Sequence, residues 1–352
     1  MSAPSTVLVT GGAGFIGSHA CVELLDHGYE LIVVDDFSNS TPEAFARVER
    51  IAGRFVGAVY ELDICDRHAL SAVFDRHCVD AVVHFAARKS LGPSAQKPVA
   101  YYDTNVGGTT TLLRAMHEHG VHQLVFSSSC SVYGEAGPGA LDESTPARPT
   151  NPYAISKWIC EQILSDVCRH RPEYTVMCLR YFNPAGAHPS GLLGEDPRGE
   201  PDNLMPYLAQ VAVGRRERLR VFGTDYPTRD GTAIRDYIHV MDTVEAHRVA
   251  LDHLADAPGM HIFNLGLGKG SSVLEVVDAF SRASGRTIPY EAAPRRPGDV
   301  TELVADATAV ARAWAWHPTR DLDDMCRDAW RFQRHNPNGY TGSARRTKGG
   351  HG

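Results

Sequence analysis

The sequence lacks the cysteine and histidine patterns that mark disulfide-rich and metal-binding proteins. Its eight cysteines include no Cys-x-x-Cys pair and show no repeated spacing. None of its 17 histidines belongs to a His-Glu-x-x-His or a zinc-type His/Cys signature. We therefore expect no metal site, and the cysteines are typical of buried thiols in a reducing cytosol.

Long apolar runs and an excess of basic charge are also missing. No apolar run approaches the length of a membrane span, and the chain begins with a strand-like segment instead of a basic-then-apolar leader. The net charge is -7, whereas a nucleic-acid-binding protein normally carries a dense basic face. With 43% hydrophobic and 22% charged residues, the sequence predicts a soluble, cytoplasmic enzyme with neither a membrane nor a nucleic acid as partner.

Short β-branched runs alternate with helix-like stretches through the first half of the chain. Strands are expected at 6–10, 31–34, 58–62, 81–85, 124–127 and 176–180, and helices at 14–27, 67–77, 99–118 and 152–168. Several of the strands are apolar on both faces, as parallel strands are when helices cover both sides of a sheet. This repeated strand-helix-strand order predicts an α/β fold with a doubly wound parallel sheet.

A glycine-rich turn follows the first expected strand directly. Gly11, Gly14 and Gly17 are spaced as Gly-x-x-Gly-x-x-Gly, and an amphipathic stretch follows them. Glycine permits a tight turn, lets a pyrophosphate approach the backbone amides at a helix N-terminus, and allows that helix to pack closely on the strand. Because both the strand and the helix are in place, the pattern predicts a dinucleotide site.

Acidic residues at the ends of the next two strands indicate which dinucleotide binds. The second strand ends in Asp35-Asp36, 18 residues after Gly17. An acid at this position accepts hydrogen bonds from ribose hydroxyls and repels a 2′-phosphate, which favours NAD over NADP. Asp63 follows the third strand, where contact with the adenine and a solvated surface position are equally good explanations.

The regular alternation ends after Asn183, which suggests a change of domain. Residues 184–206 are rich in Gly and Pro with little periodicity, which is typical of a long ordered loop or a domain junction. We predict an NAD-binding Rossmann domain over 1–183, with some later segments, about 234–260, packing back on it. A smaller α/β substrate-binding domain is expected over 184–338, and a disordered tail over 339–352.

A second motif, Asn151-Pro152-Tyr153-Ala154-Ile155-Ser156-Lys157, points to acid-base chemistry. Asn151 is a favoured N-cap and Pro152 suits the first helical position, so a helix begins here. Tyr153 and Lys157 then share one helix face. An ammonium one turn away, together with the positive nicotinamide ring, is expected to lower the pKa of Tyr153 and make it a usable base.

Hydroxyl side chains also end the strand before this helix, in Ser127-Ser128-Ser129-Cys130-Ser131. The carboxyl ends of parallel strands are where ligands bind in such sheets. We expect Ser129 to hydrogen-bond the reacting hydroxyl of the substrate, and the other three serines to be structural.

These motifs together resemble the extended short-chain dehydrogenase/reductase family, and longer strings resemble its sugar-nucleotide 4-epimerases. The strings are HFAA at 84–87 with Lys89, YYDTNVGGT at 101–109, LRYFNPAGAH at 179–188, NLMPY at 203–207, RDYIHV at 235–240 and RRPGD at 295–299. The resemblance implies reversible C4 epimerisation of UDP-glucose and UDP-galactose through a 4-keto intermediate, with transient hydride transfer to bound NAD. It also implies a homodimer formed through helices at 99–118 and 152–168.

The resemblance further implies roles for individual residues. Catalysis is assigned to Tyr153, Lys157 and Ser129. The NAD site would comprise Gly11, Gly12, Gly14, Phe15, Ile16, Gly17, Asp35, Asp36, Asn39, Asp63, Ile64, Phe85, Ala86, Lys89, Thr104, Asn105, Tyr153, Lys157 and Phe182. The UDP-hexose site would comprise Ser129, Tyr153, Asn183, Asn203, Leu204, Phe222, Arg235, Arg296, Asp299 and Leu303. Two arginines are the expected partners of a diphosphate.

Two positions depart from the family pattern. Thr104 stands where members often carry Asn near the cofactor, but it keeps a hydrogen-bonding side chain. Leu303 stands where members that exclude N-acetylated sugars carry a bulky Tyr. We therefore hypothesise that this chain also interconverts UDP-GlcNAc and UDP-GalNAc, which activity assays on that pair would test.

Three other functions are compatible with parts of the sequence. A sugar-nucleotide 4,6-dehydratase needs a further acid/base pair beside the serine, where Cys130 and Ser131 stand here. A net dehydrogenase or reductase would need an exchangeable cofactor. A nucleotide-sensing binding module on the same fold would have no use for the pair formed by Tyr153 and Lys157.

Overall fold

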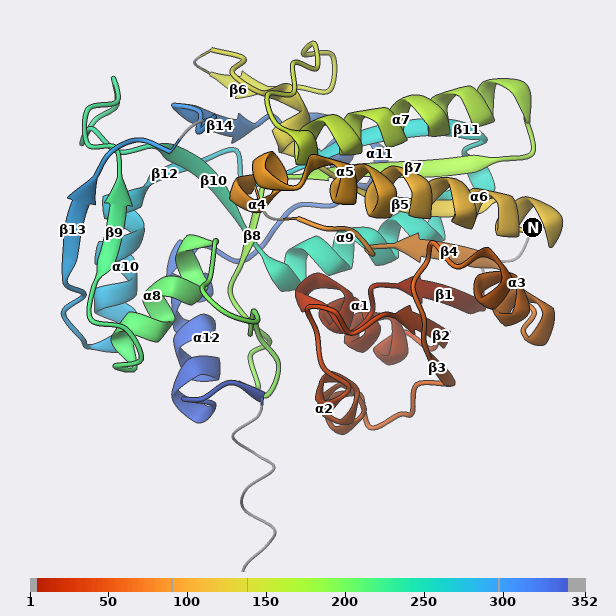
Figure 1. Ribbon diagram of the computed structural model, residues 1–352, viewed down its shortest axis with the longest axis horizontal. Coiled ribbons are helices and arrows are strands. Elements are labelled where there is room, and N and C mark those ends of the chain that lie inside the picture. The colour runs from red at the N-terminus through yellow and green to blue at the C-terminus, as the bar shows by residue number, and fades with distance from the viewer. Residues whose placement is uncertain (1–4, 90, 138, 297, 341–352) are drawn as a thin grey trace, which may run out of the picture.

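A seven-stranded parallel sheet forms the larger part of the computed structural model, which describes residues 5–340 except 90, 138 and 297 (Figure 1). Its strand order is β11-β7-β5-β4-β1-β2-β3. The strands are β1 (Thr6–Thr10), β2 (Glu30–Asp35), β3 (Ala58–Glu61), β4 (Ala81–His84), β5 (Gln123–Ser129), β7 (Thr175–Tyr181) and β11 (Gly259–Leu265). The six strands expected in the first half of the chain are confirmed to within two residues at each end.

Helices cover both faces of this sheet. One face packs against α1 (Phe15–Asp26), α2 (Glu43–Ala52), α9 (Val240–Asp252) and α11 (Thr308–Trp314), and the other against α3 (Arg67–Arg76), α6 (Gly108–Glu118) and α7 (Pro152–His170). Alternate residues of β1 supply the two apolar cores, since Val7 and Val9 belong to one and Leu8 to the other. The strands are therefore apolar on both faces, as expected for a doubly wound sheet.

The single helix expected at 99–118 is wrong. The segment divides into α5 (Pro98–Tyr101), a π-helical turn (Tyr102–Gly107) and α6, preceded by α4 (Leu91–Gln96). Within the π turn, the Asn105 amide nitrogen donates to the Arg88 carbonyl at 3.0 Å and to Ser156 Oγ at 2.8 Å. These tertiary contacts hold Asn105 where a wider turn is needed, which helical periodicity in the sequence does not reveal.

A smaller α/β part packs beside the carboxyl ends of the large sheet (Figure 1). It has a five-stranded sheet, β12-β10-β14-β6 with β8 beside β10, and a two-stranded sheet of β9 and β13. The strands are β6 (Ala140–Leu141), β8 (Asn183–Ala185), β9 (Leu219–Phe222), β10 (Ile234–His239), β12 (Gly270–Ser272), β13 (Tyr290–Ala293) and β14 (Glu302–Ala305). Around one core pack α8 (Leu204–Ala212), α10 (Val273–Ser284) and α12 (Leu322–His335). The expected fold class is confirmed.

Later segments return to the large sheet. Strand β11 pairs with β7 from Gly259 to Leu265, and α9 packs against α1. Between β8 and α8, residues 186–203 contain no helix or strand, in keeping with the loop expected there. The division of the chain into domains at 183 and 184 stays a prediction.

The expected disordered tail is wrong at its first two residues. Gly339 and Tyr340 are ordered, and the buried Tyr340 hydroxyl donates to the Gly194 carbonyl at 2.9 Å. The Arg47 guanidinium lies 4.5 Å from the centre of the Tyr340 ring. A polar, glycine-containing end predicts disorder, but one aromatic residue finds a buried partner here. Residues 341–352 lie outside the described residues.

The described residues contain neither a membrane-spanning helix nor a cluster of metal-binding side chains. No helix in the described ranges combines the length and apolar character needed to cross a bilayer. Within the same ranges, no group of three or more His, Cys, Asp or Glu side chains is arranged to hold a metal ion.

Candidate active site

Two pockets share a wall at the carboxyl ends of the parallel strands. The first pocket lies against the glycine turn and the ends of β2 and β4, and the second lies between β5, β10, β14 and α8. Five residues line both pockets, namely Phe15, Ile16, Lys89, Tyr153 and Tyr181. Ligands in the two pockets would therefore meet at these five residues.

The glycine turn of the first pocket tolerates no side chain at its closest points. A Cβ atom on Gly17 would lie 2.1 Å from the Gly11 carbonyl oxygen. Gly11 has a φ of 70°, and a Cβ there would lie 2.7 Å from the Ala86 nitrogen. Helix α1 begins at Phe15 without a side-chain cap on its first turn. Backbone amides thus face the pocket at a helix N-terminus, which fits a pyrophosphate.

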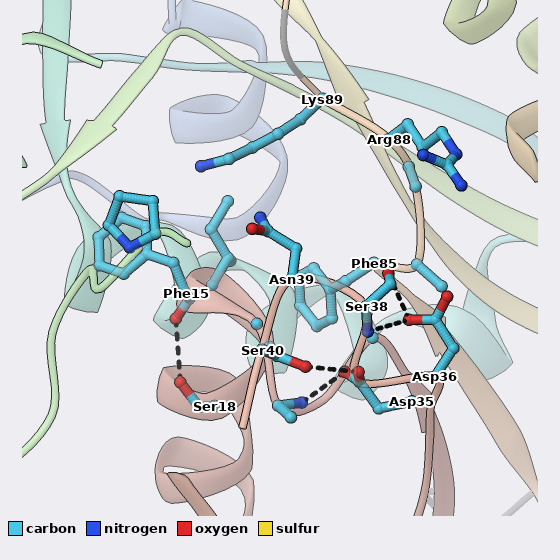
Figure 2. Close-up of a pocket in the computed structure, with 18 of the residues that line it drawn as sticks. Phe15, Ser18, Asp35, Asp36, Ser38, Asn39, Ser40, Phe85, Arg88 and Lys89 are labelled. Carbon is cyan, nitrogen blue, oxygen red and sulfur yellow. Dashed lines mark hydrogen bonds between the residues drawn. The ribbon is translucent and has the colours of Figure 1, made fainter. Parts of the chain in front are cut away.

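Asp35 lies beside the glycine turn in the wall of this pocket. Its buried carboxylate accepts hydrogen bonds from Ala13 N at 2.8 Å, from Phe37 N at 2.9 Å and from Ser40 Oγ at 2.7 Å. Figure 2 shows the bond with Ser40. A carboxylate has about four acceptor positions, so one remains for a ribose hydroxyl. Asp36 instead accepts from Ser38 within its own turn. The pocket fits a dinucleotide with an unmodified ribose.

Most of the residues assigned to NAD line the first pocket. Those present are Gly11, Gly14, Phe15, Ile16, Gly17, Asp35, Asp36, Asn39, Ile64, Phe85, Ala86, Lys89, Thr104, Tyr153 and Lys157. Gly12, Asp63, Asn105 and Phe182 are not among its lining residues.

These four residues lie elsewhere for identifiable reasons. Gly12 packs on β2, where its Cβ would lie 2.5 Å from Val33 Cγ1. Asp63 accepts from Cys65 N at 2.9 Å in the turn before α3. Asn105 anchors the π turn, and Phe182 lines the second pocket.

The first pocket also contains residues that sequence reasoning did not identify. Among them are Glu195, Asp196 and Pro197 of the loop between β8 and α8, and Tyr340 near the end of the described chain. The Gly-Pro-rich composition of 184–206 pointed to the loop, but no local pattern placed it against the glycine turn.

The catalytic helix begins as its sequence indicates. Asn151 Oδ1 accepts from Ala154 N at 2.9 Å, and Pro152 is the first helical residue. Tyr153 and Lys157 are both buried. The Lys157 ammonium donates to the Ser127 carbonyl at 2.7 Å and lies 4.9 Å from the centre of the Phe126 ring. The lysine is therefore held by β5.

The expected lowering of the Tyr153 pKa by Lys157 is not what this arrangement produces. Burial raises the pKa of Tyr153 to about 12, and the hydrogen bond with Ser129 opposes that rise. Burial also disfavours the charged form of Lys157, and for an ammonium this lowers the pKa. Within the protein, Ser129 is thus the neighbour that favours the phenolate, and a cationic ligand in the first pocket would add to its effect.

The serines at the end of β5 have distinct partners. Ser129 accepts from Ser131 Oγ at 3.0 Å, so its own proton is free to point at Tyr153. Ser127 Oγ lies 2.9 Å from His247 Nε2, and Ser128 donates to Glu161 Oε1 at 2.5 Å. Ser127 and Ser128 therefore stabilise the strand, as expected. Ser129 lines the second pocket, and so does Ser131, which was expected to be structural.

All ten residues assigned to the UDP-hexose line the second pocket. They are Ser129, Tyr153, Asn183, Asn203, Leu204, Phe222, Arg235, Arg296, Asp299 and Leu303. The guanidinium of Arg235 is ion-paired with Asp299, and that of Arg296 lies 3.9 Å from the centre of the Phe222 ring. Asn183 Oδ1 is buried without a hydrogen-bond partner. Two cations and an unpaired acceptor suit an anionic, hydroxyl-rich ligand.

Comparison with known proteins gives concordant matches over nearly the whole chain. Residues 7–266 match the model of the NAD dependent epimerase/dehydratase family. A UDP-glucose 4-epimerase of Bacillus subtilis (strain 168) is 51% identical over 334 residues, covering 95% of this chain and 98% of the relative.

Solved structures agree with these matches. The UDP-glucose 4-epimerase of Bifidobacterium longum, in complex with NAD+ and UDP, superposes with a TM-score of 0.93 at 48% identity, covering 95% of this chain and 99% of that one. The enzyme of Stenotrophomonas maltophila, with bound NAD and formylated UDP-arabinopyranose, gives a TM-score of 0.92 at 46% identity over 95% and 99% of the two chains.

Proposed function

The chain belongs to the NAD dependent epimerase/dehydratase family, and from this premise we propose how its two pockets share the chemistry of a C4-epimerase. The protein interconverts UDP-glucose and UDP-galactose and uses NAD. The first pocket holds the dinucleotide and the second holds the UDP-hexose. The observation that carries this assignment is that Tyr153 lines both pockets.

Tyr153 and Ser129 act on the C4 hydroxyl of the sugar. Tyr153 accepts the hydroxyl proton as its phenolate, and Ser129 stabilises that phenolate by a hydrogen bond. NAD, held by the glycine turn and Asp35, would supply the hydride acceptor and donor for C4. The hydrogen bond from Lys157 to the Ser127 carbonyl fixes the lysine side chain, and with it the start of α7, against β5. The proton then returns from Tyr153 to the C4 oxygen.

Turning the keto sugar over requires that the UDP part stay anchored while the hexose is loosely held. Arg235 and Arg296 would neutralise the diphosphate, and Asn183 offers its unpaired acceptor to a ligand hydroxyl or amide. Because Asp299 already pairs with Arg235, that guanidinium is held in place before the substrate arrives.

We extend the proposal to N-acetylated sugars on the basis of Leu303. Its side chain is buried in β14, in register with Arg235, and it lines the second pocket. Leucine is smaller than the tyrosine found in family members that exclude such sugars. UDP-GlcNAc and UDP-GalNAc are therefore additional substrates in this proposal.

We also propose that the protein is a homodimer and that it is located in the cytoplasm. Helices α6 and α7, which cover one face of the large sheet, would form a four-helix contact with their copies. Val99 of α5, at the edge of this face, is 69% exposed. Light scattering of the purified protein measures the mass, and a monomeric mass at micromolar concentration would refute the dimer.

The experiment that tests the function is incubation of the purified protein with UDP-galactose without added cofactor. Formation of UDP-glucose supports the proposal, and conversion of UDP-GlcNAc in a parallel reaction supports the wider substrate range. A 4-keto-6-deoxy product would instead indicate a dehydratase. Turnover only with added NAD, with net reduction of it, would indicate a dehydrogenase.

A further inference from the structure

A short loop segment, residues 194–198, borders the first pocket. It is held by hydrogen bonds with Tyr340 and with Ser40. We call it the bridging segment. The Tyr340 backbone nitrogen donates to Asp196 Oδ2 at 2.8 Å, beside the bond from the Tyr340 hydroxyl to Gly194. The Arg198 guanidinium donates to the Ser40 carbonyl at 2.8 Å, in the turn that also carries Asn39. The bridging segment therefore has a fixed position over the first pocket.

Glu195, within the bridging segment, joins one side chain from each pocket. Its side chain is only 8% exposed. Its Oε1 atom accepts from Lys89 Nζ at 2.8 Å and from Asn203 Nδ2 at 2.9 Å. Lys89 lines both pockets, whereas Asn203 lines the second alone. One carboxylate oxygen thus connects a residue of the NAD side with a residue of the UDP-hexose side.

The hydrogen bond to Glu195 determines the orientation of the Asn203 side chain. Asparagine is favoured as an N-cap because its oxygen accepts from a backbone N–H in the first helical turn. Asn203 is the N-cap of α8, yet its side chain makes no capping hydrogen bond, and its amide nitrogen donates to Glu195 instead. Glu195 therefore sets the orientation of this amide within the second pocket.

Glu195 also restrains the cation that lies between the two pockets. In Figure 2 the Lys89 ammonium extends toward the Phe15 side of the first pocket, whereas the Arg88 guanidinium points the other way. Lys89 is 45% exposed, and its ammonium is ion-paired with the largely buried Glu195 carboxylate, which favours one orientation of the long side chain. Without that carboxylate, the ammonium would be free to follow whichever diphosphate is present.

We propose that Glu195 is a positioning residue that couples NAD binding to UDP-hexose binding. The proposal rests on the function proposed above. Glu195 holds Lys89 and Asn203 in one arrangement. The second pocket therefore binds the UDP-hexose more tightly when NAD fills the first pocket, and the first pocket binds NAD more tightly when the second is filled. Such coupling is reciprocal, so a ligand of the second pocket raises the affinity for NAD by the same factor by which NAD raises the affinity for that ligand, and slower NAD release is the expected sign of the tighter binding. Glu195 does not touch the reacting hydroxyl, so its loss affects KM more than kcat.

The test compares NAD release from the holoenzyme with and without saturating UDP, an unreactive probe of the second pocket. In the wild type, UDP slows NAD release about tenfold, within the usual range of coupling between sites. Glu195→Gln removes the charge and brings the ratio of the two rates close to one. It also raises KM for UDP-galactose about tenfold while kcat changes less than about threefold. Glu195→Asp, which keeps the charge, restores part of the ratio.

Glu217→Gln is the matched control, because the Glu217 side chain is 91% exposed, and it leaves the ratio and KM at wild-type values. A wild-type ratio in Glu195→Gln, or no slowing by UDP in the wild type, overturns the proposal. Should Glu195→Gln fail to fold by thermal melting, Asn203→Ala removes one partner of the carboxylate and must lower the same ratio. Absence of epimerisation by the wild-type protein would instead refute the function itself.

Discussion

The first pocket takes its shape mainly from backbone that is close in sequence, whereas the second is assembled from side chains that are far apart. Gly11 to Gly17 and the acids that end β2 form one wall of the first pocket within about one strand-helix-strand unit. The second pocket gathers Ser129, Asn203, Arg235 and Arg296 from β5, the N-cap of α8, β10 and the loop after β13. A backbone-built site tolerates few substitutions, while a side-chain-built site changes specificity with single ones. Four predictions test this difference.

The largest effect is expected at the residue that both pockets share. Tyr153→Phe removes the proton acceptor but keeps the ring, so kcat should fall about 10³-fold, while the content of bound NAD stays the same. Turnover of UDP-galactose and NAD released on denaturation measure the two quantities. Tyr290→Phe, at an exposed position, serves as the control. Retention of more than a tenth of the activity would show that another group accepts the proton.

The next largest effect is expected in the glycine turn. Gly17→Ala places a methyl group 2.1 Å from the Gly11 carbonyl oxygen, so the turn must open. We expect bound NAD to fall to less than about a tenth, with a loss of about 1–3 kcal/mol of unfolding free energy. Gly53→Ala is the control, since a Cβ there meets nothing within 4 Å. Its left-handed φ costs about 1 kcal/mol, and NAD content stays unchanged. Equal NAD loss in both variants would contradict the role of the turn.

A selective effect is expected in the second pocket. Leu303→Tyr adds bulk beside Arg235, so kcat/KM for UDP-GlcNAc should fall roughly tenfold to a hundredfold. The value for UDP-galactose should change by less than about threefold. Leu303→Ile keeps the volume and should leave both values near those of the wild type. If Leu303→Tyr alters neither sugar, Leu303 does not face the C2 substituent.

The smallest effect is expected in the pH dependence of stability, to which a buried residue of each sheet contributes with opposite sign. Burial lowers the pKa of His84, under the first pocket, to about 3, whereas burial raises the pKa of Asp236, in β10, to about 6. Unfolded His takes up a proton below about pH 6.5, so the stability that neutral His84 contributes is complete above that pH and declines as the pH falls toward 3. Asp236 takes up its proton below about pH 6 in the folded protein but only at lower pH in the unfolded chain. Acidification from pH 6 therefore increases the contribution of Asp236 to stability, opposite to its effect through His84.

Unfolding by urea at pH 7 and pH 5, at a fixed NAD concentration, separates the two contributions. His84→Gln should reduce the loss of stability on acidification by up to about 1.4 kcal/mol per pH unit, and Asp236→Asn should increase that loss. His27→Gln, at an exposed position, should alter nothing. A shift of the same sign in both variants would contradict the opposite burial effects.

Local chemistry was enough to predict much of this protein from its sequence. Strand and helix periodicity, the spacing of Gly11, Gly14 and Gly17, and the N-cap at Asn151 each depend on residues close in the chain. The structure contains these features, except that the helix expected at 99–118 is interrupted. The resemblance to known epimerases then brought together the residues that line the second pocket.

Tertiary structure alone decided the features that depend on distant partners. Asn105 imposes a π turn through contacts with Arg88 and Ser156, and the ring of Tyr340 finds a buried place near Gly194. Burial, which no local pattern specifies, raises the pKa of Tyr153. Sequence determines what each residue can donate or accept, but desolvation and contact across long separations exist only once the chain has packed.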